Sequence, residues 1–253
     1  MGILSQKTNL KVANLGSGSY SPLLYYIRLK ELLADDFKFD HIIVFVDISD
    51  IHDETLYYTQ NNELKHRYDK IKIYETEEIK NKNISQKNKL KNFIHKNFIM
   101  TFSSISSIKR QYFLFDPYDV FKKDVARYAW TFNNHLDDFS ADQINDGIKK
   151  AKNNMNKIYA LSNSNNIKFS IAVYPLPAQL LYDTVDNRQA KEWKNFCVNK
   201  CYNFYDFNNV LFKKKDGMNE KKFFKDYFIT YDEHFNYNGN KILADEFIKI
   251  YKP

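Results

Sequence analysis

Phe39-Asp-His-Ile-Ile-Val-Phe-Val-Asp47 is the stretch that decides the fold. Its unbroken apolar run is typical of a strand buried on both faces of a parallel sheet. Polar residues follow at once, in Asp47-Ile-Ser-Asp-Ile-His-Asp-Glu54, and open α/β sheets bind their ligands beyond the carboxyl ends of such strands. We therefore expect a functional site after this strand and a structural role for His41 at its other end.

Outward from this strand, helix and strand patterns alternate along the chain. Apolar residues at helical spacing predict helices over 23–33, 141–162 and 189–200, and a last helix that carries Ile242, Leu243, Phe247 and Ile250. Further strands are predicted over 10–15, over 167–174 and, at a sheet edge, over 202–207. This alternation predicts an α/β fold with three layers (α/β/α) and a mainly parallel sheet.

The pattern weakens in the middle of the chain. Residues 65–91 are rich in Lys, Asn and Glu, so we expect one domain over 1–253 with an exposed helical and loop excursion at about 55–140. Helices are predicted over 89–109 and 117–130. Aromatic clusters at 112–118 and 128–132 are read as core, or as a groove that stacks sugar rings.

Composition restricts the class of protein. A chain of 253 residues that is 43% hydrophobic can bury one sizeable core. The net charge of +7 comes almost entirely from Lys, whereas nucleic-acid readers usually cluster Arg on one face. We therefore expect a solvated basic surface and no nucleic-acid partner. No apolar run reaches the ~20 residues of a membrane helix, so no membrane segment is expected.

Cysteine and histidine spacing suggests neither a bridge nor a metal site. Cys197 and Cys201 lie four apart in a predicted helix, which is an awkward geometry for a disulfide, so we expect thiols. They leave the compartment undecided. Four further histidines share no metal-ligand spacing and stay unassigned: His52, His66, His95 and His135.

Two more polar segments stand at the ends of predicted elements. Gly16-Ser-Gly-Ser-Tyr-Ser-Pro22 precedes a helix, and it is either a plain turn or one whose backbone N–H groups face a ligand. Asp232 and His234 lie two apart just before the last helix. A carboxylate that accepts from Nδ1–H leaves Nε2 free as a general base. The simpler alternative is an exposed His beside solvated acids.

The order of these segments resembles the SGNH (GDSL-like) hydrolases, a family of esterases and O-acyltransferases. Asn14-Leu-Gly-Ser-Gly-Ser-Tyr-Ser21 is similar to the family's second block, and Asp47-Ile-Ser-Asp50 stands where its third block reads Gly-x-Asn-Asp. Asp232-Glu-His234, followed by Asn236 and Gly239, resembles the fifth block and is the most specific match. Tyr174-Pro-Leu-Pro177 looks like a segment of bacterial members, and over 55–165 the resemblance is slight.

The resemblance implies an SGNH fold with a flavodoxin-like sheet and a Ser-His-Asp mechanism. His234 would be the base and Asp232 its partner, with Ser19 N–H and the Ser49 hydroxyl as oxyanion donors. Supporting positions are Asn14, Gly16 and Asp50. The implied substrate is a small-molecule or glycan acyl ester, acetyl above all, with no metal or organic cofactor. Bacterial members of the family favour the cell envelope as the compartment.

The nucleophile is the departure from the family pattern. Its Gly-Asp-Ser block should precede Asn14 by a strand and a helix, but only thirteen residues do so, and Ser5 follows no strand. We expect the sequence to be an N-terminally incomplete fragment. The alternative is a chain without a nucleophile that binds acyl or sugar groups on the same fold. A basic nucleic-acid-binding protein is the third hypothesis.

Overall fold

A computed structural model describes the chain except for residues 1, 19, 57–128, 133–140, 231 and 252–253. The chain divides into two compact units, residues 1–56 with 120–253 and residues 57–119, and all described residues belong to the first. Most of the expected excursion therefore lies outside the described residues. So do the helix over 89–109, most of that over 117–130, the cluster at 112–118, and His66, His95 and His135.

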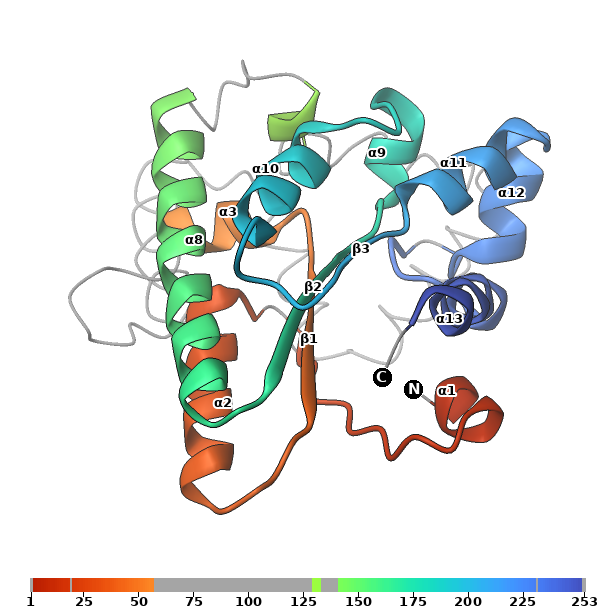
Figure 1. Cartoon of the computed structure of the whole chain (residues 1–253). Helices are drawn as coiled ribbons and strands as arrows, with labels where there is room; N and C mark the ends of the chain where they lie inside the picture. Colours follow the sequence, from red (N-terminus) through yellow and green to blue (C-terminus); the bar gives the residue numbers. More distant parts are fainter. Residues whose placement is uncertain (1, 19, 57–128, 133–140, 231, 252–253) are drawn as a thin grey trace, which may run out of the picture. The chain divides into compact units, whose positions relative to one another are not determined.

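Three parallel strands form the described sheet, in the order β1-β2-β3 (Figure 1). They are β1 (His41–Val46), β2 (Lys168–Val173) and β3 (Phe204–Asp206). β1 and β2 are paired along their whole length, from His41 opposite Lys168 to Val46 opposite Val173. Three of the four predicted strands are thus present, and β3 is an edge of the described sheet. The mainly parallel α/β fold is confirmed.

Helices account for most of the remaining described residues, and each predicted helix outside the excursion is present. The predicted ones are α2 (Pro22–Ala34), α8 (Ala141–Ser164), α10 (Arg188–Cys197) and α13 (Tyr237–Ile250). The others are α1 (Gly2–Lys7), α3 (Asp50–Leu56), the 3-10 turn η1 (Ala129–Thr131), α9 (Pro177–Tyr182), α11 (Asn208–Asp216) and α12 (Glu220–Tyr227).

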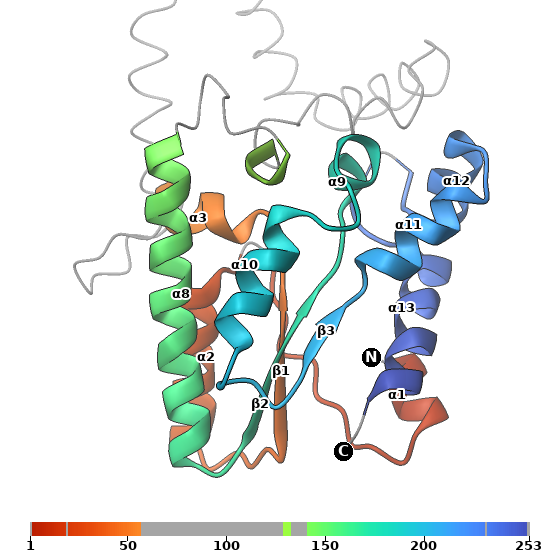
Figure 2. The same cartoon turned by 45° about the horizontal axis from the view of Figure 1, so that its top comes forward.

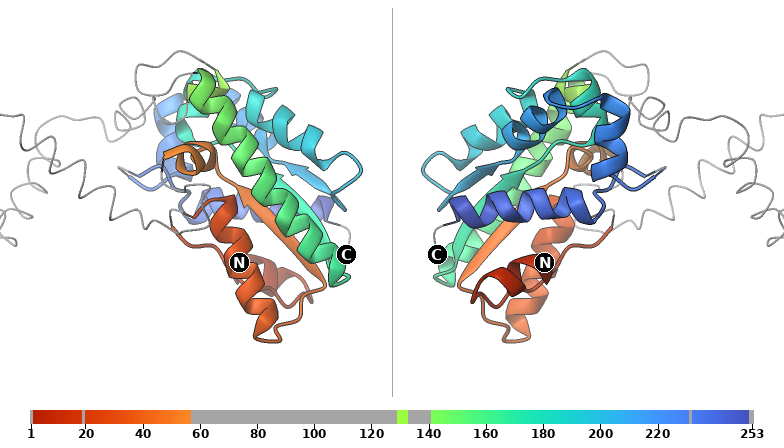
Figure 3. Two further views of the ribbon diagram at one scale, coloured as in Figure 1. Left: turned by 90° about the vertical axis from the view of Figure 1, so that its left-hand side faces the viewer. Right: turned by 90° about the vertical axis from the view of Figure 1, so that its right-hand side faces the viewer.

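Alternating side chains of the strands feed two cores, one on each face of the sheet. Ile171 and Val173 of β2 join the larger core, to which α2, α8 and α10 contribute. Ala172, between them, joins the smaller core with Phe247 of α13. Figures 1 and 3 show these helix groups on opposite sides of the strands. The arrangement is compatible with an α/β/α architecture. Trp130 of the cluster at 128–132 is buried in the larger core.

The sequence pattern was wrong at 10–15 and missed several short helices. Residues 10–15 are irregular, because alternation makes a strand only where a neighbouring strand supplies hydrogen bonds. α3 escaped prediction because its acids look solvated in the sequence, whereas Asp50, Asp53 and Glu54 are all buried. Figure 2 shows α3 and α9 at the same end of the sheet, beyond the carboxyl ends of β1 and β2.

The expectation of free thiols is also wrong, because Cys197 and Cys201 form a disulfide. α10 ends at Cys197, and the chain then turns through Asn199, whose φ is 62°. Leaving the helix brings the two Cα atoms to 4.7 Å, within the usual range for a disulfide. The predicted helix over 189–200 continued past this turn, and that is why a bridge looked awkward.

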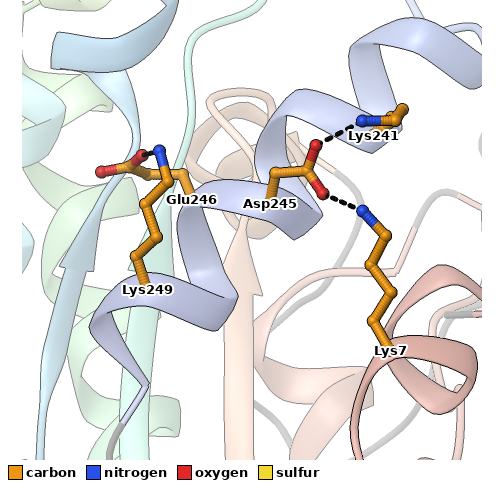
Figure 4. A network of polar contacts seen from close by, with 5 residues as sticks. All are labelled: Lys7, Lys241, Asp245, Glu246 and Lys249. Atoms are coloured by element: carbon orange, nitrogen blue, oxygen red, sulfur yellow. Dashed lines mark hydrogen bonds and ion pairs between the residues drawn. The ribbon is translucent and has the colours of Figure 1, made fainter.

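One surface ion pair, between Lys7 and Asp245, joins α1 to α13. Asp245 accepts from Lys7 of α1 at 2.6 Å and from Lys241, one turn earlier in α13, at 2.5 Å (Figure 4). Lys249 pairs with Glu246 at 3.0 Å on the same helix. Exposed pairs of this kind contribute little to stability. No helix that the structure describes is long and apolar enough to cross a membrane.

His41 is held in a partly buried network at the amino end of β1. Its Nε2 lies 2.8 Å from Ser170 Oγ and its Nδ1 lies 3.3 Å from the Tyr251 hydroxyl. Burial, assisted by the charge of Lys168, lowers the pKa of His41 from 6.5 to about 4. His41 is therefore neutral in the folded protein at neutral pH and joins β1 to β2, in keeping with a structural role.

We expect His41 to make the protein less stable in acid. The unfolded chain takes up a proton near pH 6.5 and the folded chain near pH 4, so stability is lost as the pH falls through this window. Because the ring is partly solvated, the loss should be about 1–2 kcal/mol. Urea unfolding across the window measures it. His41→Gln, which does not titrate, should lack this component, and identical pH dependence in both proteins would contradict the assignment.

Removing the disulfide should cost little stability because the loop it closes is short. Chain entropy for a loop of this size predicts a loss of about 2 kcal/mol at most. Urea unfolding of Cys197→Ser/Cys201→Ser beside the oxidised protein measures the difference, and dithiothreitol should not affect the double variant. Detection of two free thiols in the unreduced, folded chain would rule out the bridge.

Candidate functional site

Two carboxylates lie where β1 leads into α3: Asp47 directly follows β1, and Asp50 begins α3. Asp47 Oδ1 accepts from Ser49 N–H at 2.7 Å, and Asp50 Oδ2 accepts from Asp47 N–H at 3.2 Å. These bonds satisfy backbone donors at the helix start, which is a usual task of Asp. The N–H of Ser49 is thereby occupied, and among the donors of Ser49 only its hydroxyl is left for an oxyanion.

Two tyrosines meet these carboxylates from neighbouring elements. The hydroxyl of Tyr25, in α2, lies 3.2 Å from both oxygens of Asp50, and that of Tyr174, just after β2, donates to Asp47 Oδ2 at 3.1 Å. Burial first, and then the charge of Asp47, raise the pKa of Asp50 well above its usual value. Burial also raises the pKa of both tyrosines well above 10, so both stay protonated and act as neutral donors.

The turn over 14–21 ends against α3. Asn14 Oδ1 accepts from Gly16 N–H at 3.1 Å within the exposed part of the turn. Ser21 is fully buried and donates to Glu54 Oε1 at 3.0 Å. The carbonyl of Tyr20 lies 3.0 Å from the Tyr25 hydroxyl, which also reaches Asp50. Asn14 and Gly16 thus shape the turn, and Ser19 lies outside the described residues.

A short hairpin carries His234. Phe228 and Phe235 form an antiparallel bridge with ring centroids 4.7 Å apart. Between them, Ile229 N–H donates to the carbonyl of His234 at 2.9 Å. His234 therefore lies in a loop whose two ends are held together by this bridge and hydrogen bond.

Asp232 and His234 are paired as the sequence predicts. Asp232 Oδ1 is hydrogen-bonded to Nδ1 of His234 and also accepts its backbone N–H at 3.0 Å. The His234 side chain is 74% exposed. In the described part of the chain, Nε2 of His234 carries no hydrogen bond. Partial burial lowers the pKa of His234, but the bond to Asp232 and the charges of Asp232, Glu233 and Asp47 outweigh it and raise the pKa above 6.5.

Asn236 and Gly239 hold the hairpin against α12 and α13. Asn236 Oδ1 accepts from the N–H groups of Asn238 and Gly239, while its amide donates to the carbonyls of Asp226 and Phe228. A Cβ on Gly239 would lie 2.3 Å from the carbonyl oxygen of Tyr227. The Asn-x-x-Gly pattern is therefore a structural clamp for the loop that carries the histidine.

The polar segments meet at the carboxyl end of the sheet. Tyr174 lies 5.9 Å, between ring centroids, from Phe235 of the hairpin and also bonds Asp47. Asp47 in turn acts on the pKa of His234. The Ser49 hydroxyl makes no described hydrogen bond to His234, and no described Ser, Thr or Cys does so. The structure thus pairs His234 with a carboxylate, and no described hydroxyl or thiol is hydrogen-bonded to the imidazole.

Tyr25, Tyr174 and Glu54 were missed as site residues, and Asp47 was read only as part of a motif. Tyr174 had a detectable signal. Val46 and Val173 are opposite one another in register, so the residues that follow them, Asp47 and Tyr174, emerge side by side from parallel strands. Buried acids such as Glu54 give no such signal, because their burial depends on partners distant in sequence.

Gly239→Ala should loosen the hairpin. The added Cβ has no room against backbone, so we expect the free energy of unfolding to fall by about 1–3 kcal/mol and the NMR signals of His234 to shift. Gly217→Ala is the matched control, because its nearest atom, the carbonyl oxygen of Lys213, would be 3.8 Å away. Equal stability of the two variants in urea would contradict the clamp.

Comparisons with known proteins add no family to this geometry. No family model, no curated protein and no solved structure matches the chain.

Proposed function

We propose that this chain carries the base and carboxylate of an SGNH-type ester hydrolase or O-acyltransferase, on an SGNH-like version of its α/β fold. The substrate would be an acyl ester, above all an acetyl ester, of a small molecule or a glycan. The observation that carries the proposal is the hydrogen bond that His234 Nδ1–H donates to Asp232, with Nε2 left open. Its position beside Asp47, at the carboxyl ends of β1 and β2, adds support.

The chemistry assigned to this pair is proton transfer during acyl transfer. Nε2 of His234 takes the proton of a serine hydroxyl while the oxygen attacks the acyl carbon. Asp232 stabilises the resulting imidazolium, which then protonates the departing alkoxide. Water or a second hydroxyl, activated in the same way, resolves the acyl-enzyme. The attacking serine would not be one of the described residues that contact His234.

One of the candidate oxyanion donors of this proposal lies next to a carboxylate. Ser19 and Ser49 remain the candidates, but the N–H of Ser49 already serves Asp47 at 2.7 Å. A carboxylate at that point opposes a developing negative charge on the acyl oxygen. Acyl transfer with Ser49 as donor would be most effective when the Asp47 charge is neutralised or turned away.

The carboxylate of Asp47 beside the candidate oxyanion donor Ser49 favours a second candidate, a non-catalytic module that binds carbohydrate or acyl groups on this fold. Carboxylates and tyrosine hydroxyls, such as Asp47 and Tyr174, can bind sugar hydroxyls without any need to stabilise an oxyanion. The disulfide between Cys197 and Cys201 suits either candidate in an oxidising compartment such as the bacterial envelope.

Hydrolysis of p-nitrophenyl acetate tests the enzyme proposal. His234→Ala should lower kcat/KM by about 10²–10⁴-fold, and Asp232→Asn should lower it less. Activity should rise with pH through a midpoint above 6.5, because the pKa of His234 is raised. Asp186→Asn, which removes an exposed acid paired with Lys191 at 2.9 Å, is the control and should leave the rate unchanged.

A fluorophosphonate probe complements the rate measurement. It labels an activated serine, and peptide mapping would then locate the nucleophile. Turnover that survives in His234→Ala would refute the assigned base. No labelling and no turnover, together with glycan binding in NMR titrations, would favour the binding module.

A further inference from the structure

Asp47 stands where the third block of the SGNH hydrolases, Gly-x-Asn-Asp, has its glycine, so this chain carries a carboxylate at a position without a side chain in that pattern. It follows β1 directly, and both of its carboxylate oxygens are engaged. Oδ1 accepts from Ser49 N–H at 2.7 Å and Oδ2 from the Tyr174 hydroxyl at 3.1 Å. Both donors are neutral, so they fix the direction of the carboxylate and leave its negative charge in place.

Tyr174 links this carboxylate to the hairpin of His234. Its hydroxyl holds Asp47, and its ring packs on Phe235 at 5.9 Å. Phe235 is the next residue after His234 and is bridged to Phe228. One side chain therefore sets both Asp47 and the hairpin at the carboxyl end of the sheet.

The groups that act on the imidazole come from two directions. Asp232 and Glu233 lie on the hairpin itself, and Asp47 acts from the end of β1. Tyr174 stands beside Asp47, and the buried Asp50 lies behind it, with its own pKa raised by burial and by Asp47. The raised pKa keeps Asp50 protonated to higher pH than an ordinary aspartic acid.

We infer that Asp47, held at the end of β1 by Tyr174, whose ring packs on the residue after His234, stabilises the protonated form of His234 in addition to the carboxylates of the hairpin. Asp47 and Tyr174 are positioning residues, since they act through the histidine. The inference rests on the proposed function for its meaning in catalysis. It adds Asp47, from the end of β1, to Asp232 and Glu233 of the hairpin as the carboxylates that stabilise the imidazolium formed when Nε2 accepts a proton.

NMR titration of the His234 Cε1–H signal in the full chain tests this inference. Asp47→Asn keeps an oxygen that can accept from Ser49 N–H but removes the charge, so the midpoint should fall by about 0.5 pH unit at low salt. Asp232→Asn should lower it further. Tyr174→Phe keeps the ring against Phe235 and should lower the midpoint by no more than Asp47→Asn does. The double variant Asp47→Asn/Tyr174→Phe should match Asp47→Asn alone.

Asp186→Asn is the control for this titration. Asp186→Asn removes one negative charge from the exposed pair with Lys191 and should leave the midpoint unchanged. Equal midpoints in Asp47→Asn and Asp186→Asn, with the amide signals of Phe235 and Asn236 in their original positions, would overturn the inference. The titration needs no turnover, so it can succeed where the hydrolysis assay fails and can fail where that assay succeeds.

Discussion

The double-sided burial of β2 is the constraint on which the described structure depends. β2 pairs with β1 on one edge and β3 on the other, and five of its six residues are buried. A strand in this position can shift neither in register nor along its axis without exposing apolar side chains or breaking hydrogen bonds. Its end is therefore fixed, and so is the place where Asp47 and Tyr174 emerge together.

The residues that surround His234 are acidic, although the chain as a whole is basic. The protein carries a net charge of +7, yet the charges that act most strongly on His234 are the carboxylates of Asp232, Glu233 and Asp47. Two neutral donors, Ser49 N–H and the Tyr174 hydroxyl, hold Asp47 in place. Such an environment suits a base that must become positively charged, and it suits an oxyanion poorly. In the proposed acyl transfer, the Asp47 carboxylate would thus favour protonation of the histidine and disfavour charge on the acyl oxygen.

The hairpin shows how a short motif can combine packing with chemistry. Asn236 and Gly239 form no part of the proposed chemistry. They close the loop against α12 and α13, because the amide bonds backbone carbonyls and the glycine lets Tyr227 approach. That closure holds Asp232 and His234 at the sheet edge while leaving the imidazole exposed.

The sequence by itself determined the periodic parts of the protein. Apolar runs and helical spacing predicted β1, β2, β3, α2, α8, α10 and α13, and local spacing predicted the pairing of Asp232 with His234, because these features depend on residues close in the chain. Only the tertiary structure decided what depends on distant partners. The irregular path of 10–15, the burial of Glu54 in α3, and the contacts of Tyr25 and Tyr174 with Asp50 and Asp47 belong to this class. The end of α10 belongs to it as well, since that turn allows the disulfide. Burial and register are properties of packed neighbours, and a single sequence states them only indirectly.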